Sequence, residues 1–232
     1  MPLSAVSLAL RLVLVALLAG AVGGGLLTAL QAVKTEPLIR AAETFEHART
    51  GTGPSDAGAA EEEWEPAPGL ERWSYTLLAN ALAATGYALI LLAGFTIRRG
   101  VTWRSGLIWG LGGFAAFALA PMLGLPPPLP GTELADLEGR QAWWIGTAVA
   151  TAGGLALIAF AAPRIKVAGA IILVLPHLVG APTPAGFSAV PAEIAGQFVS
   201  ATLFTNLVLW LALGALTGLA FSRFVHGPRV AA

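Results

Sequence analysis

Residues 6–30 read VSLALRLVLVALLAGAVGGGLLTAL, an apolar run in which Arg11 is the sole charged residue. A helix needs about 20 apolar residues to cross the hydrocarbon core of a bilayer, and this run exceeds that length. Five further apolar stretches follow, at 74–96, 106–123, 143–162, 167–181 and 198–221. The pattern predicts an all-α, polytopic membrane helix bundle of six transmembrane helices, with residues 1–232 as a single integral membrane domain.

The composition of the whole chain agrees with residence in a lipid bilayer. Hydrophobic residues make up 56% of the sequence and charged residues 11%, whereas soluble domains are about 25% charged. The chain has no cysteine, which excludes disulfides and thiolate metal sites. The low charge gives no reason to expect a nucleic-acid partner.

The first apolar stretch has a second interpretation, a signal peptide that is cleaved. Arg11 lies inside the run rather than before it, and no clear A-x-A cleavage site follows. We therefore expect the segment to be retained as a span. Cleavage would leave five spans with the same sidedness.

The charged residues are divided between the two sides that six spans define. One side receives only basic residues: Arg11, Arg98, Arg99, Arg104, Arg164, Lys166, Arg223 and Arg229. The other side receives all thirteen carboxylates together with Lys34, Arg40, Arg49, Arg72 and Arg140. Because cytoplasmic segments carry the Lys/Arg excess, both termini are predicted to be cytoplasmic, with the chain in the inner (cytoplasmic) membrane. The acidic outer face suggests cation handling.

The outer loop at residues 32–73 is predicted to be acidic and partly helical. Pro37 can begin a helix, and Glu43 and His47 stand four residues apart, so their side chains share one helix face. A carboxylate and an imidazole in this arrangement can bind one divalent ion. The alternative is a solvated face on which Glu43 and Glu46 pair with neighbouring arginines. The acidic block at 61–65 would raise the local cation concentration.

A polar stripe descends from the outer face along the second span. Arg72, Thr76 and Asn80 follow one another at four-residue spacing, and Glu71 precedes them. An intramembrane asparagine either lines a pathway or hydrogen-bonds a neighbouring helix.

The fifth stretch contains the sequence Leu175-Pro176-His177, followed by Gly180 and Pro182. We expect an interrupted helix here, with His177 at the break near the outer leaflet. Transporters use broken helices for ion sites, and ionisable residues within the membrane are functional by default. The alternative is a structural histidine that hydrogen-bonds the carbonyl freed by Pro176.

The second outer loop, at residues 182–196, carries one charge, Glu193. Pro191 is typical of a first helical residue, which places Glu193 in the first turn, where capping also explains it. Gln197 continues the same polar face into the last span.

Small residues recur at four-residue spacing in three spans, a pattern that lets helix backbones approach closely. It indicates tight bundle packing, with a glycine hinge as the alternative. The residues are Ala16, Gly20, Gly24 and Thr28, then Gly106 and Gly110, then Gly214 and Gly218.

The sequence lacks three motifs that are typical of common enzyme classes. It contains no G-x-x-x-x-G-K-[ST], no H-E-x-x-H and no G-x-S-x-G. We therefore expect a carrier, channel or complex subunit and not an enzyme, although a membrane enzyme using Glu43 and His47 remains a third interpretation.

Motifs spread over almost the whole chain resemble the CbtA family of predicted cobalt transporter subunits. They are Pro37-Leu38-Ile39 with Ala42-Glu43-Thr44-Phe45-Glu46, Leu70-Glu71-Arg72 with Tyr75-Thr76-Leu77-Leu78-Ala79-Asn80, Gly112-Gly113-Phe114, Ala120-Pro121, Arg140-Gln141-Ala142-Trp143-Trp144, Leu175-Pro176-His177-Leu178-Val179-Gly180-Ala181-Pro182, and Val190-Pro191-Ala192-Glu193 with Gln197-Phe198. The resemblance implies cobalt(II) uptake linked to cobalamin synthesis, with no prosthetic group, and a small single-span CbtB-like partner. The family is usually described with about five spans.

Together these observations predict a transporter subunit for a divalent metal cation. The alternative is a non-transporting scaffold or assembly subunit of a partner transporter. The candidate metal ligands are His177, Glu43, Glu46, His47, Glu71 and Glu193, and the candidate pathway residues are Asn80, Gln197 and Thr76.

Overall fold

The computed structural model describes residues 5–50, 66–67, 69–98, 100–184, 186, 188 and 190–225, and these residues form helices and connecting loops without a strand. Within the helices, the side chains of residues 5, 47–50 and 225 lie outside the description. The helices are α1 (Ala5–Lys34), α2 (Glu36–Thr50), α3 (Leu70–Ile97), α4 (Trp103–Phe114), η1 (Ala115–Leu119), α5 (Ala120–Gly124), α6 (Leu137–Phe160), α7 (Pro163–Val179), α8 (Ala192–Ala220) and η2 (Phe221–Val225). The predicted all-α membrane bundle is confirmed.

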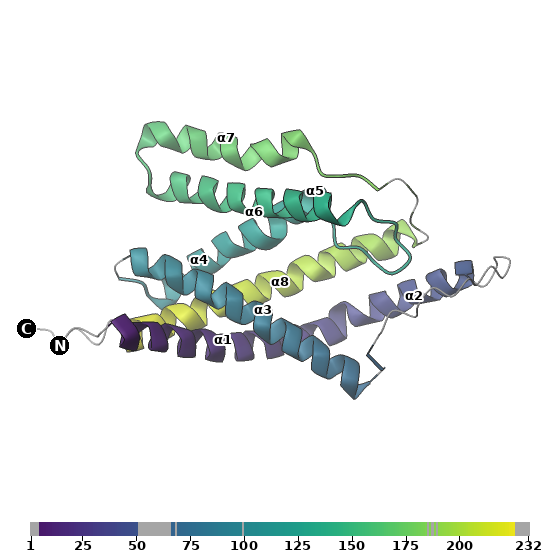
Figure 1. The fold of residues 1–232 in the computed structure, drawn as a ribbon, viewed down its shortest axis with the longest axis horizontal. Coiled ribbons are helices and arrows are strands. Elements are labelled where there is room, and N and C mark those ends of the chain that lie inside the picture. Colours follow the sequence, from purple (N-terminus) through teal and green to yellow (C-terminus); the bar gives the residue numbers. More distant parts are fainter. Residues whose placement is uncertain are drawn as a thin grey trace, which may run out of the picture.

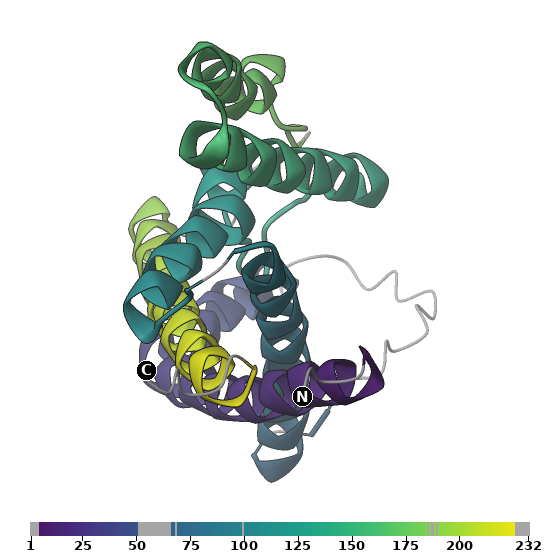
Figure 2. The same ribbon diagram turned by 90° about the vertical axis from the view of Figure 1, so that its left-hand side faces the viewer.

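A central bundle of α1, α3, α4 and α8 holds the largest apolar core (Figures 1 and 2). Trp210 of α8 is 1% exposed and lies at its centre. Its ring stacks on Phe117 at 5.5 Å and lies 4.6 Å from the ring of Tyr87. Because these rings come from three separate segments, Trp210 joins α8 to α3 and to η1.

Glycines mark the points where the helices of this bundle cross most closely. A methyl group added to Gly106 of α4 would overlap the carbonyl of Gly214 in α8, and one on Gly214 would overlap the carbonyl of Gly106. In α1, a methyl on Gly24 would lie 2.5 Å from backbone atoms of Ala81 in α3. Close helix packing, the first interpretation of the small-residue stripes, is confirmed.

The third apolar stretch is one continuous path of α4, η1 and α5 rather than a regular α-helix. Pro121 has no N–H with which to reach the carbonyl four residues earlier. The Ala120 N–H donates instead to the Ala115 carbonyl, five residues back. The widened π turn η1 therefore lies just before the proline.

Among the residues that the structure describes, five helical paths are long and apolar enough to cross a membrane: Val6–Lys34, Leu70–Ile97, Trp103–Gly124, Leu137–Phe160 and Ala192–Phe224. The remaining apolar stretch forms α7, a shorter helix of 17 residues. The expected break at Pro176 is wrong, because α7 continues through Pro176 and His177 and ends at Gly180, whose φ is 86°. A proline in a membrane helix removes one hydrogen bond without ending the helix, whereas a positive φ ends it.

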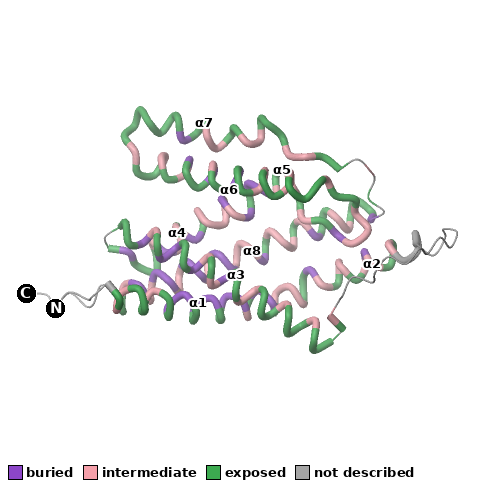
Figure 3. Tube along the Cα trace, in the orientation of Figure 1, coloured by how far each residue is buried: buried purple, intermediate pink, exposed green. Residues whose placement is uncertain are grey.

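Helices α6 and α7 form a hairpin that extends away from the central bundle (Figure 2). Helix α6 contacts η1 and α5, while α7 packs mainly against α6. Most of the α7 surface is exposed in the burial colouring of Figure 3, and Gly169 is its buried residue.

The described ends of the chain meet at one end of the bundle, on the left of Figure 1. Arg11 of α1 donates a 2.6 Å hydrogen bond from Nη1 to the carbonyl oxygen of Phe224 in η2. We call this end the terminal face. The opposite end, the loop face, carries α2, the start of α3, the α5–α6 loop and the start of α8.

Candidate functional site

Helix α2 is held against the loop face by an apolar contact. Ala42 is fully buried and packs in a cluster with Leu129 of the α5–α6 loop, Val190 of the loop before α8, and Phe198 of α8. The alternation of apolar and acidic residues along α2 produces this orientation, because residues three or four apart share one helix face. With Ala42 turned to α8, the neighbouring Glu43 lies on the side of α2 that reaches α3.

The passage from α1 to α2 is nearly continuous and directs α2 outward. The Thr35 N–H donates to the Gln31 carbonyl at 2.9 Å, and its hydroxyl donates to the same oxygen at 3.1 Å. The Ile39 N–H in turn donates to the Thr35 carbonyl at 3.0 Å. Pro37 lies in the first turn of α2, as the sequence predicts, because a proline there loses no helical hydrogen bond.

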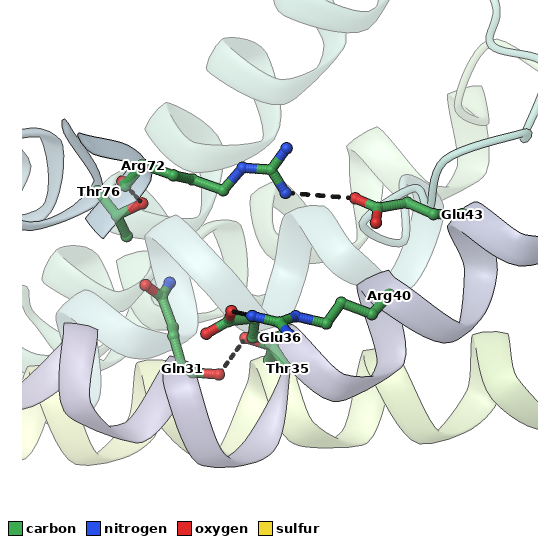
Figure 4. Close-up of polar contacts among 7 residues, drawn as sticks. All are labelled: Gln31, Thr35, Glu36, Arg40, Glu43, Arg72 and Thr76. Carbon is green, nitrogen blue, oxygen red and sulfur yellow. Dashed lines mark hydrogen bonds and ion pairs between the residues drawn. The ribbon is translucent and has the colours of Figure 1, made fainter. Parts of the chain in front are cut away.

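Two ion pairs lie where α1, α2 and α3 meet (Figure 4). Arg72 of α3 places Nη1 3.5 Å from Oε1 of Glu43 in α2. Arg40 pairs with Glu36 one turn away within α2. The Arg72–Glu43 pair is partly exposed, so it contributes on the order of 1 kcal/mol or less to stability. The pair also means that the Glu43 carboxylate already has a guanidinium as its partner.

Below this pair, a hydrogen-bonded cluster joins α1 and α3 within the spans. The Asn80 side-chain amide donates to Gln31 Oε1 at 2.7 Å and to Thr28 Oγ1 at 2.9 Å. Thr28 donates in turn to the Gly24 carbonyl at 2.9 Å. Both amide protons of Asn80 are used, which fixes the orientation of its side chain and points its carbonyl oxygen away from these partners.

Thr76 lies between the ion pair and the Asn80 cluster. Its hydroxyl donates to the Arg72 carbonyl one turn earlier, at 2.8 Å, and the side chain is half-buried. Arg72, Thr76 and Asn80 therefore follow one another on successive turns of α3, with side-chain partners for the first on α2 and for the last on α1. We call this line the polar seam and define it as Glu43, Arg72, Thr76, Asn80, Gln31 and Thr28.

The polar seam contains three of the predicted site residues, Glu43, Thr76 and Asn80. Arg72 was recognised as part of the stripe, but Gln31 and Thr28 were not predicted as members. Their spacing of three residues at the outer end of the first span places them on one helix face. The sequence could have indicated from that spacing that Gln31 and Thr28 act together. It could not identify Asn80 as their partner, because that depends on where α1 crosses α3.

The other predicted residues lie elsewhere on the loop face. Glu71 is exposed in the first turn of α3 and accepts the Ala67 N–H at 3.3 Å. Glu46 packs against the α5–α6 loop, where a methyl added to Gly131 would lie 3.3 Å from its Cβ. The side chain of His47 and the acidic block at 61–65 lie outside the described residues.

Glu193 and Gln197 form a pair on the first turns of α8. The Gln197 amide donates to the Glu193 carboxylate at 3.5 Å, and both side chains are exposed. The position of Glu193 in the first helical turn is confirmed.

His177 lies on the α6–α7 hairpin. It contacts Trp143 of α6 edge-on, with ring centroids 5.9 Å apart. His177 is thus held by a different helix pair from Asn80, which bonds to α1. Within the described part of the chain, no group of three His, Asp or Glu side chains gathers in a way that would hold a metal ion.

Comparison with known proteins identifies one family. The sequence pattern of a family described as "Probable cobalt transporter subunit (CbtA)" matches residues 9–222. No curated protein and no solved structure matches the chain.

Proposed function

Because this chain belongs to the CbtA family of probable cobalt transporter subunits, we propose that it conducts a divalent cation, cobalt(II), along the polar seam. The family makes it a multi-pass membrane protein and a transporter subunit, and the five long apolar helices agree with that. The finer proposals concern the ion, the direction of transport and the residues involved.

We propose that the ion enters at the loop face, because the carboxylates that attract cations lie in the segments that lead to it. All carboxylates of the sequence fall in segments that lead to the loop face or outside the described residues, while the segments at the terminal face carry arginine and lysine without any carboxylate. The excess of basic residues marks the cytoplasmic side. A cation that enters at the loop face therefore moves into the cell, which makes the proposed activity uptake.

The polar seam is the observation that carries the proposal. It begins at the Glu43 carboxylate and reaches Asn80, eight residues below Arg72 on α3. At 1.5 Å per residue, that depth is about 12 Å. Polar side chains at such depth are costly and are usually functional. The side-chain oxygens of Glu43, Thr76 and Asn80 are ligands that suit hard and borderline divalent ions.

The ion pair at the top of the seam suggests how an ion would enter. A divalent cation carries twice the charge of the Arg72 guanidinium, so it competes for the Glu43 carboxylate and releases Arg72 to solvent. The neutral oxygens below bind a cation more weakly than a carboxylate does. Weak successive sites allow an ion both to enter and to leave.

Cobalt flux into proteoliposomes tests this proposal. The purified chain is reconstituted alone and together with a small single-span partner, and uptake of cobalt(II) is measured. We expect Glu43→Gln and Asn80→Ala to reduce the rate of uptake at least tenfold. Glu138→Gln, an exposed carboxylate at the start of α6 outside the seam, serves as the control and should leave uptake unchanged. Equal rates for Glu43→Gln and Glu138→Gln would refute a pathway through the seam.

The same experiment separates transport from a scaffold role. The Arg72–Glu43 pair and the Asn80 hydrogen bonds both join helices, as a scaffold also requires. A scaffold predicts that seam variants lower the amount of folded protein and that flux per folded molecule stays constant. Transport predicts that seam variants lower the flux per folded molecule, even where they also lower the amount of folded protein.

His177 lies outside the polar seam, on the α6–α7 hairpin, and its variants test whether a second metal ligand lies there. If its imidazole binds the ion, His177→Ala and His177→Gln should both lose uptake, because the amide is a poorer ligand. If it is structural, packing against Trp143, glutamine should retain uptake. Competition among cobalt, nickel, zinc and magnesium in the same vesicles identifies the preferred ion.

A further inference from the structure

A groove of about 770 Å³ opens beside the central bundle at the terminal face. Its walls come from α3, from α4 with η1, and from the second half of α6. The lining is almost wholly apolar, with Ile90, Ile108 and Leu155 among its residues. Ile108 is 70% exposed and Phe160 is 51% exposed, so the groove faces the surroundings of the bundle and is not an enclosed cavity.

The length of the groove matches one leaflet of a bilayer. Along α4 and η1 it extends from Ser105 to Phe117, with Trp210 at its deep end. At 1.5 Å per residue this path is about 18 Å long, somewhat more than half of a hydrocarbon core of about 30 Å. A crossing helix would need the full thickness of the core. An acyl chain anchored at the terminal face needs the depth that the groove offers.

The mouth of the groove carries a positive charge with no carboxylate among its lining residues. Arg98 lines the groove at the end of α3, and its guanidinium lies 4.7 Å above the ring of Phe160. No Asp or Glu occurs between residues 72 and 132 or between residues 139 and 192, which are the segments that supply α4 and the second half of α6. A negatively charged group at this mouth therefore meets a cation and no competing anion.

From this combination we infer that the groove binds an anionic phospholipid of the leaflet at the terminal face. The acyl chain lies along α4 and η1, and the phosphate pairs with the Arg98 guanidinium, which is a good geometric match for phosphate oxygens. Phe160 holds the guanidinium in place through its ring face. This inference concerns lipid recognition and is independent of the ion path along the polar seam.

Native mass spectrometry of the purified full chain tests the inference. Two lipids with identical acyl chains, phosphatidylglycerol and phosphatidylcholine, are offered at equal concentration, and retained lipid is counted. We expect the chain to retain about fivefold more phosphatidylglycerol, the ratio that one arginine near the surface supplies. Arg98→Gln should bring the ratio close to one. Arg164→Gln, which removes an exposed terminal-face charge outside the groove, should keep it. An unchanged ratio in Arg98→Gln would overturn the proposal.

A second pair of variants tests the acyl-chain position. Gly112 lines the groove, and a methyl group built on it meets no atom within 4 Å. Since the Cβ has room, Gly112→Leu should place its side chain in the groove and reduce retention of both lipids. Gly86→Leu on α3, which also meets open space, should leave retention unchanged. The contrary result is a dimer of the purified chain that Gly112→Leu abolishes, with retained lipid unchanged. In that case the groove would bind a second copy of the chain and the lipid assignment would be wrong.

Discussion

The contact between α6 and α7 rests on two glycines, and replacing either with alanine gives a sharp test of the fold. A methyl group on Gly154 would lie 2.7 Å from the carbonyl oxygen of Gly169 and 2.8 Å from Cγ of Leu173. A methyl on Gly169 would lie 2.8 Å from the Gly154 carbonyl oxygen. Ordinary contact begins at 3.4 Å, so the two backbones would have to separate by about 0.6–0.7 Å.

The magnitude follows from the cost of inserting a methyl group into a closed contact, typically about 1–3 kcal/mol. Alanine also favours a helix over glycine, by up to about 1 kcal/mol, which would mask part of the loss. Gly153 provides the correction because it is the adjacent residue on the same helix and a methyl there meets no atom within 4 Å. The difference between Gly154→Ala and Gly153→Ala therefore isolates the packing cost.

The assay is equilibrium unfolding of the purified protein in mixed micelles, followed by circular dichroism. We expect Gly154→Ala to be less stable than Gly153→Ala by about 1–3 kcal/mol, with Gly169→Ala similarly destabilised. Since α7 packs mainly against α6, loss of this contact should release α7 before the central bundle unfolds. Equal stability of Gly154→Ala and Gly153→Ala would refute the α6–α7 packing described here.

Three further predictions concern polar side chains, two of them between helices and one at the terminal face. The Thr147 hydroxyl is fully buried without a hydrogen-bond partner, so Thr147→Val should raise stability, whereas Thr217→Val should lower it by about 1 kcal/mol because that hydroxyl bonds a carbonyl one turn earlier. Asn80→Leu should lower the stability of the folded protein by about 1 kcal/mol, since it removes two hydrogen bonds between α1 and α3. Arg11→Gln should speed amide exchange in η2, because it removes the hydrogen bond to the Phe224 carbonyl. Unfolding curves test the first two, and hydrogen exchange tests the third; changes of opposite sign would contradict them.

The fold was largely predictable because a bilayer reduces the problem to length and polarity. The stretches 6–30, 74–96, 106–123 and 198–221 each fall within a long apolar helical path, and 143–162 overlaps one that ends at Phe160. The glycine stripes also predicted close packing without naming the partner of each stripe. Two local features were not predicted: the π turn before Pro121 and the passage of α7 through Pro176. Both depend on which backbone hydrogen bonds are rearranged around a proline, and residue types alone do not specify that.

The candidate site was only partly predictable. The spacing of Arg72, Thr76 and Asn80 on a single helix indicated a polar stripe from the sequence. Gln31 and Thr28 join it only because Gly24 lets α1 approach α3 at Ala81. The sequence places both His177 and Asn80 near the outer face. Distance from that face does not say which helices hold the two side chains. Their assignment to different helix pairs is set by the α6–α7 hairpin, which packs beside η1 and not beside α1.

The path of the short helix α7 determines the face from which α8 begins. At 17 residues it is about 25 Å long, a few ångströms less than the hydrocarbon core, and such a deficit can be accommodated by local thinning of the bilayer. Helix α6 ends at the terminal face and α8 begins at the loop face (Figure 1), so the chain returns along α7. If α7 lay on one surface instead, α8 would run in the opposite direction. Arg223 would then join the carboxylates, and the end of α8 could not reach Arg11, to which Phe224 is hydrogen-bonded. The ionic segregation and this hydrogen bond both agree with a crossing along α7, in addition to the five helices that are long enough to cross a membrane.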